Sequence, residues 1–254
     1  MKSSFGLGVG IFLLCFLILP RTLNAVATTD QNIDTDKDGL TDLDETVKYY
    51  TSPQLTDTDG DGKSDGEEIK NGDSPRFKGK KLSEVDSDKD GLNDSWELIL
   101  GTSLANADTD GDTFKDGLEV NSGFDPTNKN PVKVEKSIRV SDKELRLRYY
   151  FGDKELAVLP VSTGKKSTPT PHGDFKVIAK VPVKYYKGPT WDYPNTKWNL
   201  FFTTERGYRF YIHSAYWHNK FGKSPVSGGC VNVRVADMGA LYDFAQVGTK
   251  VYIQ

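Results

Sequence analysis

The strongest constraint on this chain is an acidic pattern that occurs four times before residue 120. Each copy has aspartates at positions 1, 3, 5 and 9 and a glutamate at position 12. Carboxylates at this spacing supply the oxygen ligands that Ca²⁺ takes in a binding loop, and a glycine at position 6 allows the loop to bend sharply. The carboxylates of the four copies are Asp34, Asp36, Asp38, Asp42 and Glu45; Asp57, Asp59, Asp61, Asp65 and Glu68; Asp86, Asp88, Asp90, Asp94 and Glu97; and Asp108, Asp110, Asp112, Asp116 and Glu119.

Acidic runs are also typical of solvated, disordered tails. Fixed ligand spacing in four copies argues against a tail and predicts Ca²⁺ as a structural cofactor. The fourth copy has Thr113 in place of the bending glycine, so we expect that loop to be the weakest or most distorted. The segments between loops allow one or two helical turns each, and with the linkers at 101–103 and 123–127 they resemble bacterial thrombospondin type 3 repeats.

Little apolar sequence lies between the loops, so we expect the metal, more than a hydrophobic core, to hold this region in shape. Chelation should then unfold the repeats alone and leave the remaining half of the chain folded.

The first residues have the composition of an export signal. Lys2 precedes a mostly apolar run from Phe5 to Leu19, and a small-residue site ends at Ala27. This arrangement predicts a secretory signal peptide over residues 1–27, with an uncleaved membrane anchor as the alternative. Cys15 lies inside the apolar run, so cleavage would leave Cys230 as the one cysteine of the mature chain. The predicted location is the periplasm, the cell wall or the extracellular space.

Charge divides the rest of the chain at Asn130-Pro131. Residues 28–130 hold 26 acidic and 11 basic side chains, a net charge of −15, whereas residues 131–254 hold 10 and 20, a net charge of +10. The basic half suits an anionic partner such as a cell-surface or wall polymer. Export and the absence of a nucleic-acid-binding motif argue against nucleic acid. We therefore expect repeats over 28–130 and a second domain over 131–254.

The second domain has the apolar alternation of β-strands. One helix is expected near Met238 to Ala245, with apolar residues at helical spacing and Asp237 as its cap. The fold class predicted for the chain is mainly β: a C-terminal mixed β-sandwich with one or two short helices, after the N-terminal array of loops. The expected strands are 145–149, 157–161, 175–181, 200–204, 208–213 and 250–253.

Cys230 and His213 are the candidate nucleophile and base. A lone cysteine is more often a buried small hydrophobe than a catalytic residue. Cys230, however, follows two glycines in a predicted turn, and His213 ends an alternating strand. A neighbouring imidazole can take the thiol proton and lower its pKa, which is the arrangement that cysteine acyl transfer requires. Gly229 is a candidate contributor to an oxyanion hole.

These residues also carry a family resemblance. Tyr-Ile-His-Ser at 211–214 and Ser-Gly-Gly-Cys-Val-Asn at 227–232 are similar to the signature of the L,D-transpeptidase catalytic domain, and so are segments at 161–165, 168–175, 236–242 and 247–251. The resemblance runs from about residue 137 to the end. It implies that the Ser214 carbonyl orients the base and that Asn232 matches the asparagine after the cysteine. Gly228 stands where the family usually has a second histidine, which affects pocket shape, rate or substrate choice.

The resemblance implies an exported enzyme that acts on peptidoglycan stem peptides. Cys230 would form a thioester at a diamino acid and release the terminal D-Ala, and an amine of another stem would complete a cross-link, with no catalytic cofactor. Water as the acceptor would make the protein an L,D-carboxypeptidase. A papain-like protease is disfavoured because its cysteine precedes its histidine. The alternative from another class is a non-catalytic, calcium-dependent adhesion protein of the wall or surface.

The remaining histidines and aromatic residues are weaker candidates. His172 and His218 are expected to be surface or lid residues rather than a second base. Five aromatic residues could line a substrate groove, but aromatic residues are more often part of the core, so the groove is the less favoured interpretation. They are Trp191, Tyr193, Trp198, Tyr216 and Trp217.

Overall fold

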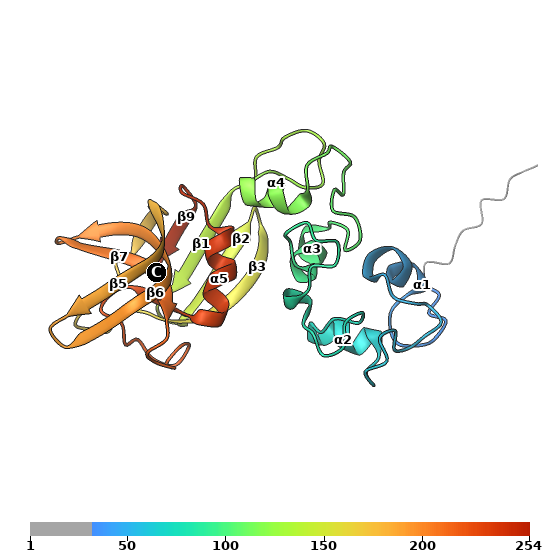
Figure 1. Cartoon of the computed structure of the whole chain (residues 1–254), viewed down its shortest axis with the longest axis horizontal. Helices are drawn as coiled ribbons and strands as arrows, with labels where there is room; N and C mark the ends of the chain where they lie inside the picture. Colours follow the sequence, from blue (N-terminus) through green and yellow to red (C-terminus); the bar gives the residue numbers. More distant parts are fainter. Residues whose placement is uncertain (1–31) are drawn as a thin grey trace, which may run out of the picture. The chain divides into compact units, whose positions relative to one another are not determined.

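The computed structural model describes residues 32–254 (Figure 1). The predicted export signal at 1–27, including Cys15, lies outside the described residues and stays a prediction. Within residues 32–254, no helix has the length and apolar character needed to cross a membrane.

Each acidic loop runs into a short helix that begins at the loop's position-9 aspartate. These helices are α1 (Asp42–Asp44), continued by the π-helical turn η1 (Glu45–Tyr49), then α2 (Asp65–Asn71), α3 (Asp94–Leu100) and α4 (Asp116–Ser122), with the 3-10 turn η2 (Leu82–Glu84) between α2 and α3. α2, α3 and α4 end where Gly72, Gly101 and Gly123 adopt positive φ. The predicted array of loops with short helical turns is confirmed.

The loops associate in two pairs. The Asp38 carboxylate accepts a hydrogen bond from the Gly66 N–H at 2.8 Å, and the Asp90 carboxylate accepts one from the Gly117 N–H at 2.6 Å. A Cβ atom at Gly66 would lie 2.3 Å from the Asp38 carbonyl oxygen, and one at Gly117 would lie 2.6 Å from that of Asp90. The second and fourth loops therefore require glycine directly after their position-9 aspartate, which the ligand spacing alone did not reveal.

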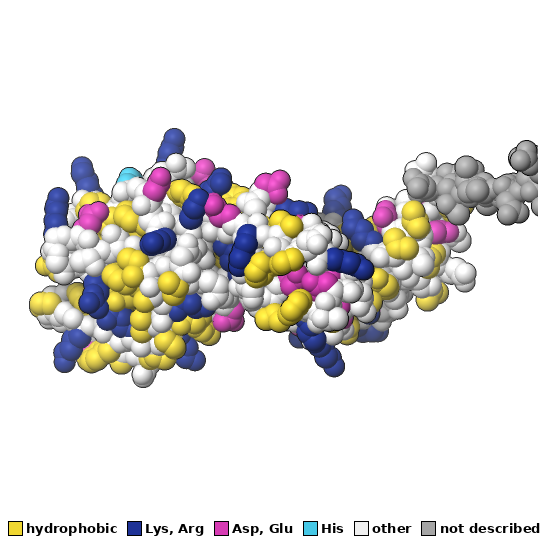
Figure 2. All heavy atoms as spheres, turned by 90° about the horizontal axis from the view of Figure 1, so that it is seen from above, with side chains coloured by type: hydrophobic (Ala, Val, Ile, Leu, Met, Phe, Trp, Pro, Cys, Tyr) yellow, Lys and Arg dark blue, Asp and Glu magenta, His cyan; other side chains and the backbone are white. Residues whose placement is uncertain are grey.

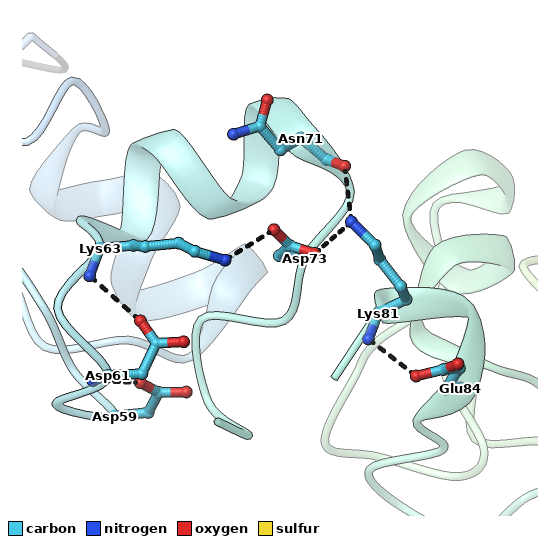
Figure 3. A network of polar contacts seen from close by, with 7 residues as sticks. All are labelled: Asp59, Asp61, Lys63, Asn71, Asp73, Lys81 and Glu84. Carbon is cyan, nitrogen blue, oxygen red and sulfur yellow. Dashed lines mark hydrogen bonds and ion pairs between the residues drawn. The ribbon is translucent and has the colours of Figure 1, made fainter. Parts of the chain in front are cut away.

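A cluster of ion pairs joins the second loop to the segment that follows it (Figure 3). Asp73 forms an ion pair with Lys63 at 3.1 Å and another with Lys81. The Lys81 main-chain N–H also donates to Glu84 at 3.2 Å. These contacts involve none of the five carboxylates predicted to bind metal in the second loop.

The second half of the chain is a curled, mixed sheet of nine strands in the order β4-β9-β1-β2-β3-β8-β7-β6-β5 (Figure 1). Its strands are β1 (Lys136–Ser141), β2 (Arg146–Phe151), β3 (Lys154–Ser162), β4 (Gly173–Lys176), β5 (Ala179–Gly188), β6 (Trp191–Glu205), β7 (Tyr208–Ala215), β8 (Val231–Arg234) and β9 (Lys250–Ile253). The β1–β9 and β7–β8 pairs are parallel and the other pairs are antiparallel. The predicted mainly β, mixed fold is confirmed.

One predicted strand, 175–181, is two strands in the structure. β4 and β5 stand at opposite ends of the strand order, yet only two residues separate them in sequence. The Val177 N–H bonds to the Thr249 carbonyl beside β9, and the Ile178 N–H bonds to the Phe201 carbonyl of β6. The chain thus passes from one edge of the sheet to the other at this point, which is possible because the sheet curls toward a half-barrel.

The single helix of this half is α5 (Val235–Phe244). Met238, Leu241 and Ala245 are buried and Tyr242 is partly buried, as the helical spacing predicts, and Phe244 is buried as well. The prediction that Asp237 caps the helix is wrong: the cap position is Arg234, with no side-chain cap bond, and its guanidinium donates to Asp237 in the first turn at 2.5 Å.

The third and fourth repeats share the hydrophobic core of the sheet. Leu92, Trp96, Leu100 and Val120 belong to the same buried cluster as strand and α5 residues. The Trp96 ring packs edge-on against Tyr149 at 5.8 Å and Phe244 at 6.0 Å. This packing argues against the expectation that chelation would unfold the repeats alone.

Two lysines strengthen this junction. Lys154 donates to the Ile99 carbonyl at the end of α3 at 2.9 Å. Buried Lys136 joins the Asn121 carbonyl of α4 to the Phe244 carbonyl of α5, with both distances 2.9 Å. Burial lowers the pKa of Lys136 to about 7, and the nearby charge of Lys180 adds to this effect. The carbonyl ends of three helices are thus satisfied by side chains of the sheet.

Candidate active site and candidate metal loops

The parallel pairing of β7 with β8 brings the candidate nucleophile and base into the same part of the sheet. His213 pairs with Asn232, and Ile212 pairs with Val231. Ile212 and Val231 point into the core. Because side chains alternate along a strand, His213 and Asn232 lie on the opposite face, and Cys230 directly precedes β8. Tyr186 stacks on the His213 ring and interacts electrostatically with Cys230, so the candidate base and nucleophile lie near the same tyrosine.

His213 is held with one ring nitrogen available. Its Nδ1 lies 2.8 Å from the Ser214 carbonyl oxygen, which accepts a hydrogen bond and so fixes the proton on Nδ1. Nε2 then carries the lone pair of a base. Tyr186 stacks on the imidazole at 4.8 Å, and its hydroxyl donates to Asn199 at 2.9 Å. Burial lowers the pKa of His213 to about 4, although the Ser214 carbonyl opposes this shift.

Cys230 is half-buried and forms no disulfide bond. Burial raises its pKa to about 11, against the opposing effects of the Tyr211 N–H and the Lys184 charge. The expectation of a lowered thiol pKa is therefore wrong for the resting site. A neutral thiol beside a neutral imidazole suits a mechanism in which proton transfer to His213 accompanies attack, rather than a preformed ion pair.

The turn before Cys230 depends on Gly229. Its φ is +118°, and a Cβ atom there would lie 2.6 Å from the Phe210 ring. Its N–H donates to the Ser227 hydroxyl at 3.0 Å in the free protein, and its contribution to an oxyanion hole stays a prediction. Gly228 is surrounded by open space, since a Cβ atom there would have no atom within 4 Å. A histidine at Gly228 would therefore meet no steric barrier at its Cβ.

His218 and Tyr186 contact the candidate site residues Asn232 and His213, and neither contact was predicted from the sequence. His218 was expected to be a surface or lid residue, but it is half-buried, and its Nε2 lies 3.0 Å from the Asn232 side-chain amide. No sequence signal connected Tyr186 with His213, because β5 reaches the site only through its pairing with β6. His172 is exposed and bonded to Asp142 at 2.8 Å, as expected of a surface residue.

A row of aromatic rings leads from the surface to His213. Trp191 stacks on Tyr193 at 6.0 Å, Tyr193 stacks on Trp217 at 3.8 Å, and Trp217 lies 5.8 Å from His213. Tyr216 packs edge-on against Trp217. Trp198 is the exception among the five aromatic candidates, because it packs against the core beside Gly239 of α5.

The four acidic loops have the geometry of cation sites. In each loop the carboxylates at positions 1, 3 and 5 offer ligand atoms within 4.8 Å of one another. The glutamate at position 12 is buried in every loop, and each has at least one oxygen without a hydrogen-bond partner; both oxygens of Glu68 and of Glu97 lack one. Acidic side chains gather in the repeat region in Figure 2. Since buried carboxylate oxygens are rarely left unpaired, these residues fit a bound Ca²⁺.

The position-9 aspartates make the same pair of hydrogen bonds in every loop. In all four loops both carboxylate oxygens accept hydrogen bonds from the N–H and hydroxyl groups of the residue at position 2, for example Thr58 to Asp65 at 2.8 and 2.6 Å. The same arrangement holds for Thr35 with Asp42, Ser87 with Asp94, and Thr109 with Asp116. These aspartates brace the loop.

Electrostatics favours a cation in every loop. Burial, reinforced by the neighbouring aspartates, raises the pKa of Glu97 to about 9 and the pKa of Glu68 to about 7. A divalent ion would remove this penalty on the charged form.

The fourth loop keeps the bend of the others. Thr113 has φ +87°, close to the +99° of Gly62, and its N–H bonds to Asp108 at 2.9 Å as the glycine N–H does in the other loops. The expected distortion is wrong; the threonine instead adopts a left-handed conformation that is strained for a β-branched residue.

The two halves match known families. Residues 135–253 match the L,D-transpeptidase catalytic domain, and residues 57–72, 86–102 and 108–129 match the bacterial TSP3 repeat. Two relatives are named "Putative L,D-transpeptidase": YqjB of Bacillus subtilis, 30% identical over 50% of this chain and 76% of its own, and YkuD of Bacillus licheniformis, 27% identical over 50% and 71%. The chain therefore belongs to the L,D-transpeptidase catalytic domain family.

Solved structures with a similar fold include an L,D-transpeptidase from Mycobacterium smegmatis, with 26% identity and a TM-score of 0.44 over 48% of this chain. Another is the Enterococcus faecium L,D-transpeptidase, with 25% identity and a TM-score of 0.42 over 50%. This chain spans 60% and 53% of the lengths of those two chains.

Proposed function

We propose that this protein is an exported cysteine acyltransferase that cross-links or anchors to peptidoglycan stem peptides. Family membership supplies the reaction class. The observation that carries the proposal for this chain is the buried His213, whose Nδ1 donates to the Ser214 carbonyl and whose ring stacks on Tyr186, which also interacts electrostatically with Cys230.

The proposed reaction needs two proton transfers through His213. The Cys230 sulfur attacks the carbonyl carbon of the diamino acid while Nε2 of His213 takes the thiol proton. The peptide bond breaks, His213 gives the proton to the leaving nitrogen of D-Ala, and a thioester remains. An acceptor amine then attacks the thioester carbonyl, and its proton returns through His213 to the thiolate.

We also propose that Ca²⁺ is a structural cofactor of the repeats. The orphaned glutamate oxygens and the close aspartate triads support this assignment. Extracellular calcium modules bind with Kd of about 10⁻⁴ to 10⁻³ M, which suits structural sites rather than sensors. A wall-facing location follows from the proposed substrate and from the basic charge of residues 131–254.

The test is intact mass after incubation with a stem tetrapeptide that ends in D-Ala. The expected result is a thioester adduct on Cys230 with release of D-Ala. Cys230→Ala should give no adduct, and a stem ending in L-Ala serves as the control substrate. Added stem amine should convert the adduct to a cross-linked product, whereas conversion by water alone would assign a carboxypeptidase. Absence of any adduct would favour a non-catalytic calcium-dependent adhesion protein.

A further inference from the structure

The loop after β7 contains a histidine whose two ring nitrogens have different partners. Nδ1 of His218 accepts a hydrogen bond from the Lys220 N–H at 3.2 Å, and Nε2 lies 3.0 Å from the side-chain amide of Asn232. A neutral imidazole has one N–H group. Because Nδ1 is the acceptor, the proton must be on Nε2, which therefore acts as a donor toward Asn232.

This proton position determines which way the Asn232 amide faces. With its nitrogen toward Nε2, the amide would set two donors against each other and leave Oδ1 buried without a partner. The opposite orientation pairs Oδ1 with the Nε2–H. This orientation also places the amide N–H₂ group where Oδ1 had no hydrogen-bond partner. Amide orientations are assigned by this kind of hydrogen-bond accounting.

The amide N–H₂ group then needs an acceptor that the free protein does not supply at that position. Asn232 is 2% exposed, and no described group forms a hydrogen bond at this position. It pairs in register with His213 and lies two residues after Cys230. Buried polar groups are normally hydrogen-bonded, and a donor in this place suits a carbonyl or carboxylate oxygen of a bound ligand.

We infer that His218 is a positioning residue that locks the Asn232 amide with its N–H₂ group toward an oxygen of the acyl donor. This inference rests on the proposed acyltransferase function for the identity of the ligand. The orientation itself follows from the contacts of His218 and does not depend on that function. His218 also contacts Phe221, with ring centroids 4.6 Å apart, which restrains the imidazole plane.

The orientation can be measured directly in the full chain by NMR of protein labelled with ¹⁵N-histidine. The chain has three histidines, so few signals need assignment, and His218→Gln and His172→Gln identify two of them. The expected result is the Nε2–H tautomer for His218 and the opposite Nδ1–H tautomer for His213. An Nδ1–H tautomer for His218 would overturn the inference whether or not the protein is an enzyme.

The effect on the reaction is measured by the rate constant of Cys230 acylation by the stem tetrapeptide. His218→Phe keeps an aromatic ring but removes the donor, and it should slow acylation about 10- to 100-fold, the effect expected for one hydrogen bond to a buried group. His218→Gln keeps a donor and should recover most of the rate. His172→Gln, at the exposed histidine, is the matched control and should react as the wild type does.

A double variant separates positioning from general damage to the fold. If His218 acts through Asn232, His218→Phe should cause little further loss in an Asn232→Ala background. Additive losses, an unchanged His218→Phe rate, or a His218→Gln variant as slow as His218→Phe would each overturn the inference. A wild-type protein that never acylates would refute the proposed function and the ligand half of the inference, whereas the tautomer would still decide the orientation.

Discussion

Replacing Glu97 with glutamine should reduce the dependence of the sheet on calcium. Glu97 is fully buried in α3, and both of its oxygens lack a partner. The adjacent Trp96 packs on Tyr149 and Phe244 of the sheet half. A cation in the third loop would therefore stabilise α3 and, through Trp96, the shared core. Glutamine keeps the shape of the side chain but is a poorer cation ligand.

The magnitude follows from binding linkage. With Kd of about 10⁻⁴ to 10⁻³ M, calcium at about 10 mM stabilises the folded state by about 1.4 to 2.7 kcal/mol for each coupled site. In a folding unit of this size, 1 kcal/mol corresponds to about 2–4 °C in Tm. In calcium, the Tm of the variant should fall by about 3–10 °C, which is most of the stabilisation that one calcium site contributes. In excess chelator the wild type should no longer have a higher Tm than the variant, and the variant's Tm should be equal or higher. The reason is that burial raises the pKa of Glu97 to about 9, and a neutral glutamine removes the cost of burying the charged carboxylate.

The assay combines thermal unfolding with hydrogen exchange of β2 peptides in calcium and in chelator. Glu45→Gln is the matched control, because Glu45 is the equivalent buried residue of the first loop, and that loop contributes no residue to the shared core among those described. It should lower calcium affinity without changing β2 protection. Equal β2 protection with and without calcium, or equal effects of the two variants, would refute the reasoning.

Four further predictions concern single residues. Thr113→Gly should stabilise the calcium-loaded protein by about 1 kcal/mol in urea unfolding by relieving the left-handed strain at φ +87°; a loss of stability would contradict this. The pKa of His213 is lowered to about 4 in the folded state, against about 6.5 in the unfolded state. Its contribution to the free energy of unfolding is therefore complete above about pH 6.5 and is lost at about 1.4 kcal/mol per pH unit as the pH falls toward 4. His213→Gln should flatten that slope in unfolding curves at pH 7 and pH 5. Iodoacetamide labelling of Cys230 should keep accelerating above pH 9, because burial raises its thiol pKa to about 11, and a plateau near neutral pH would indicate a preformed ion pair. Gly228→His should preserve or increase acylation, since its Cβ would meet no atom within 4 Å, and a complete loss would show that the open space has a function.

The local parts of both sites could be predicted from sequence. Ligand spacing within one loop, such as Asp57 to Glu68, is a property of neighbouring residues, and so is the positive φ that glycine permits at position 6. The alternation around His213 and the glycine turn before Cys230 are local in the same sense. These patterns gave the loops, most strands, and the nucleophile and base as candidates.

The contacts between distant segments were decided only by the tertiary structure. Periodicity could not reveal the parallel pairing of β7 with β8, the placement of Tyr186 against His213, or the bond from His218 to Asn232, because each joins residues through the packing of other elements. The thiol pKa depends on burial, which no motif encodes. Trp96 looked like one apolar residue in a short helix, and only the packing of α3 on the sheet made it part of a core that ties the third repeat to the sheet.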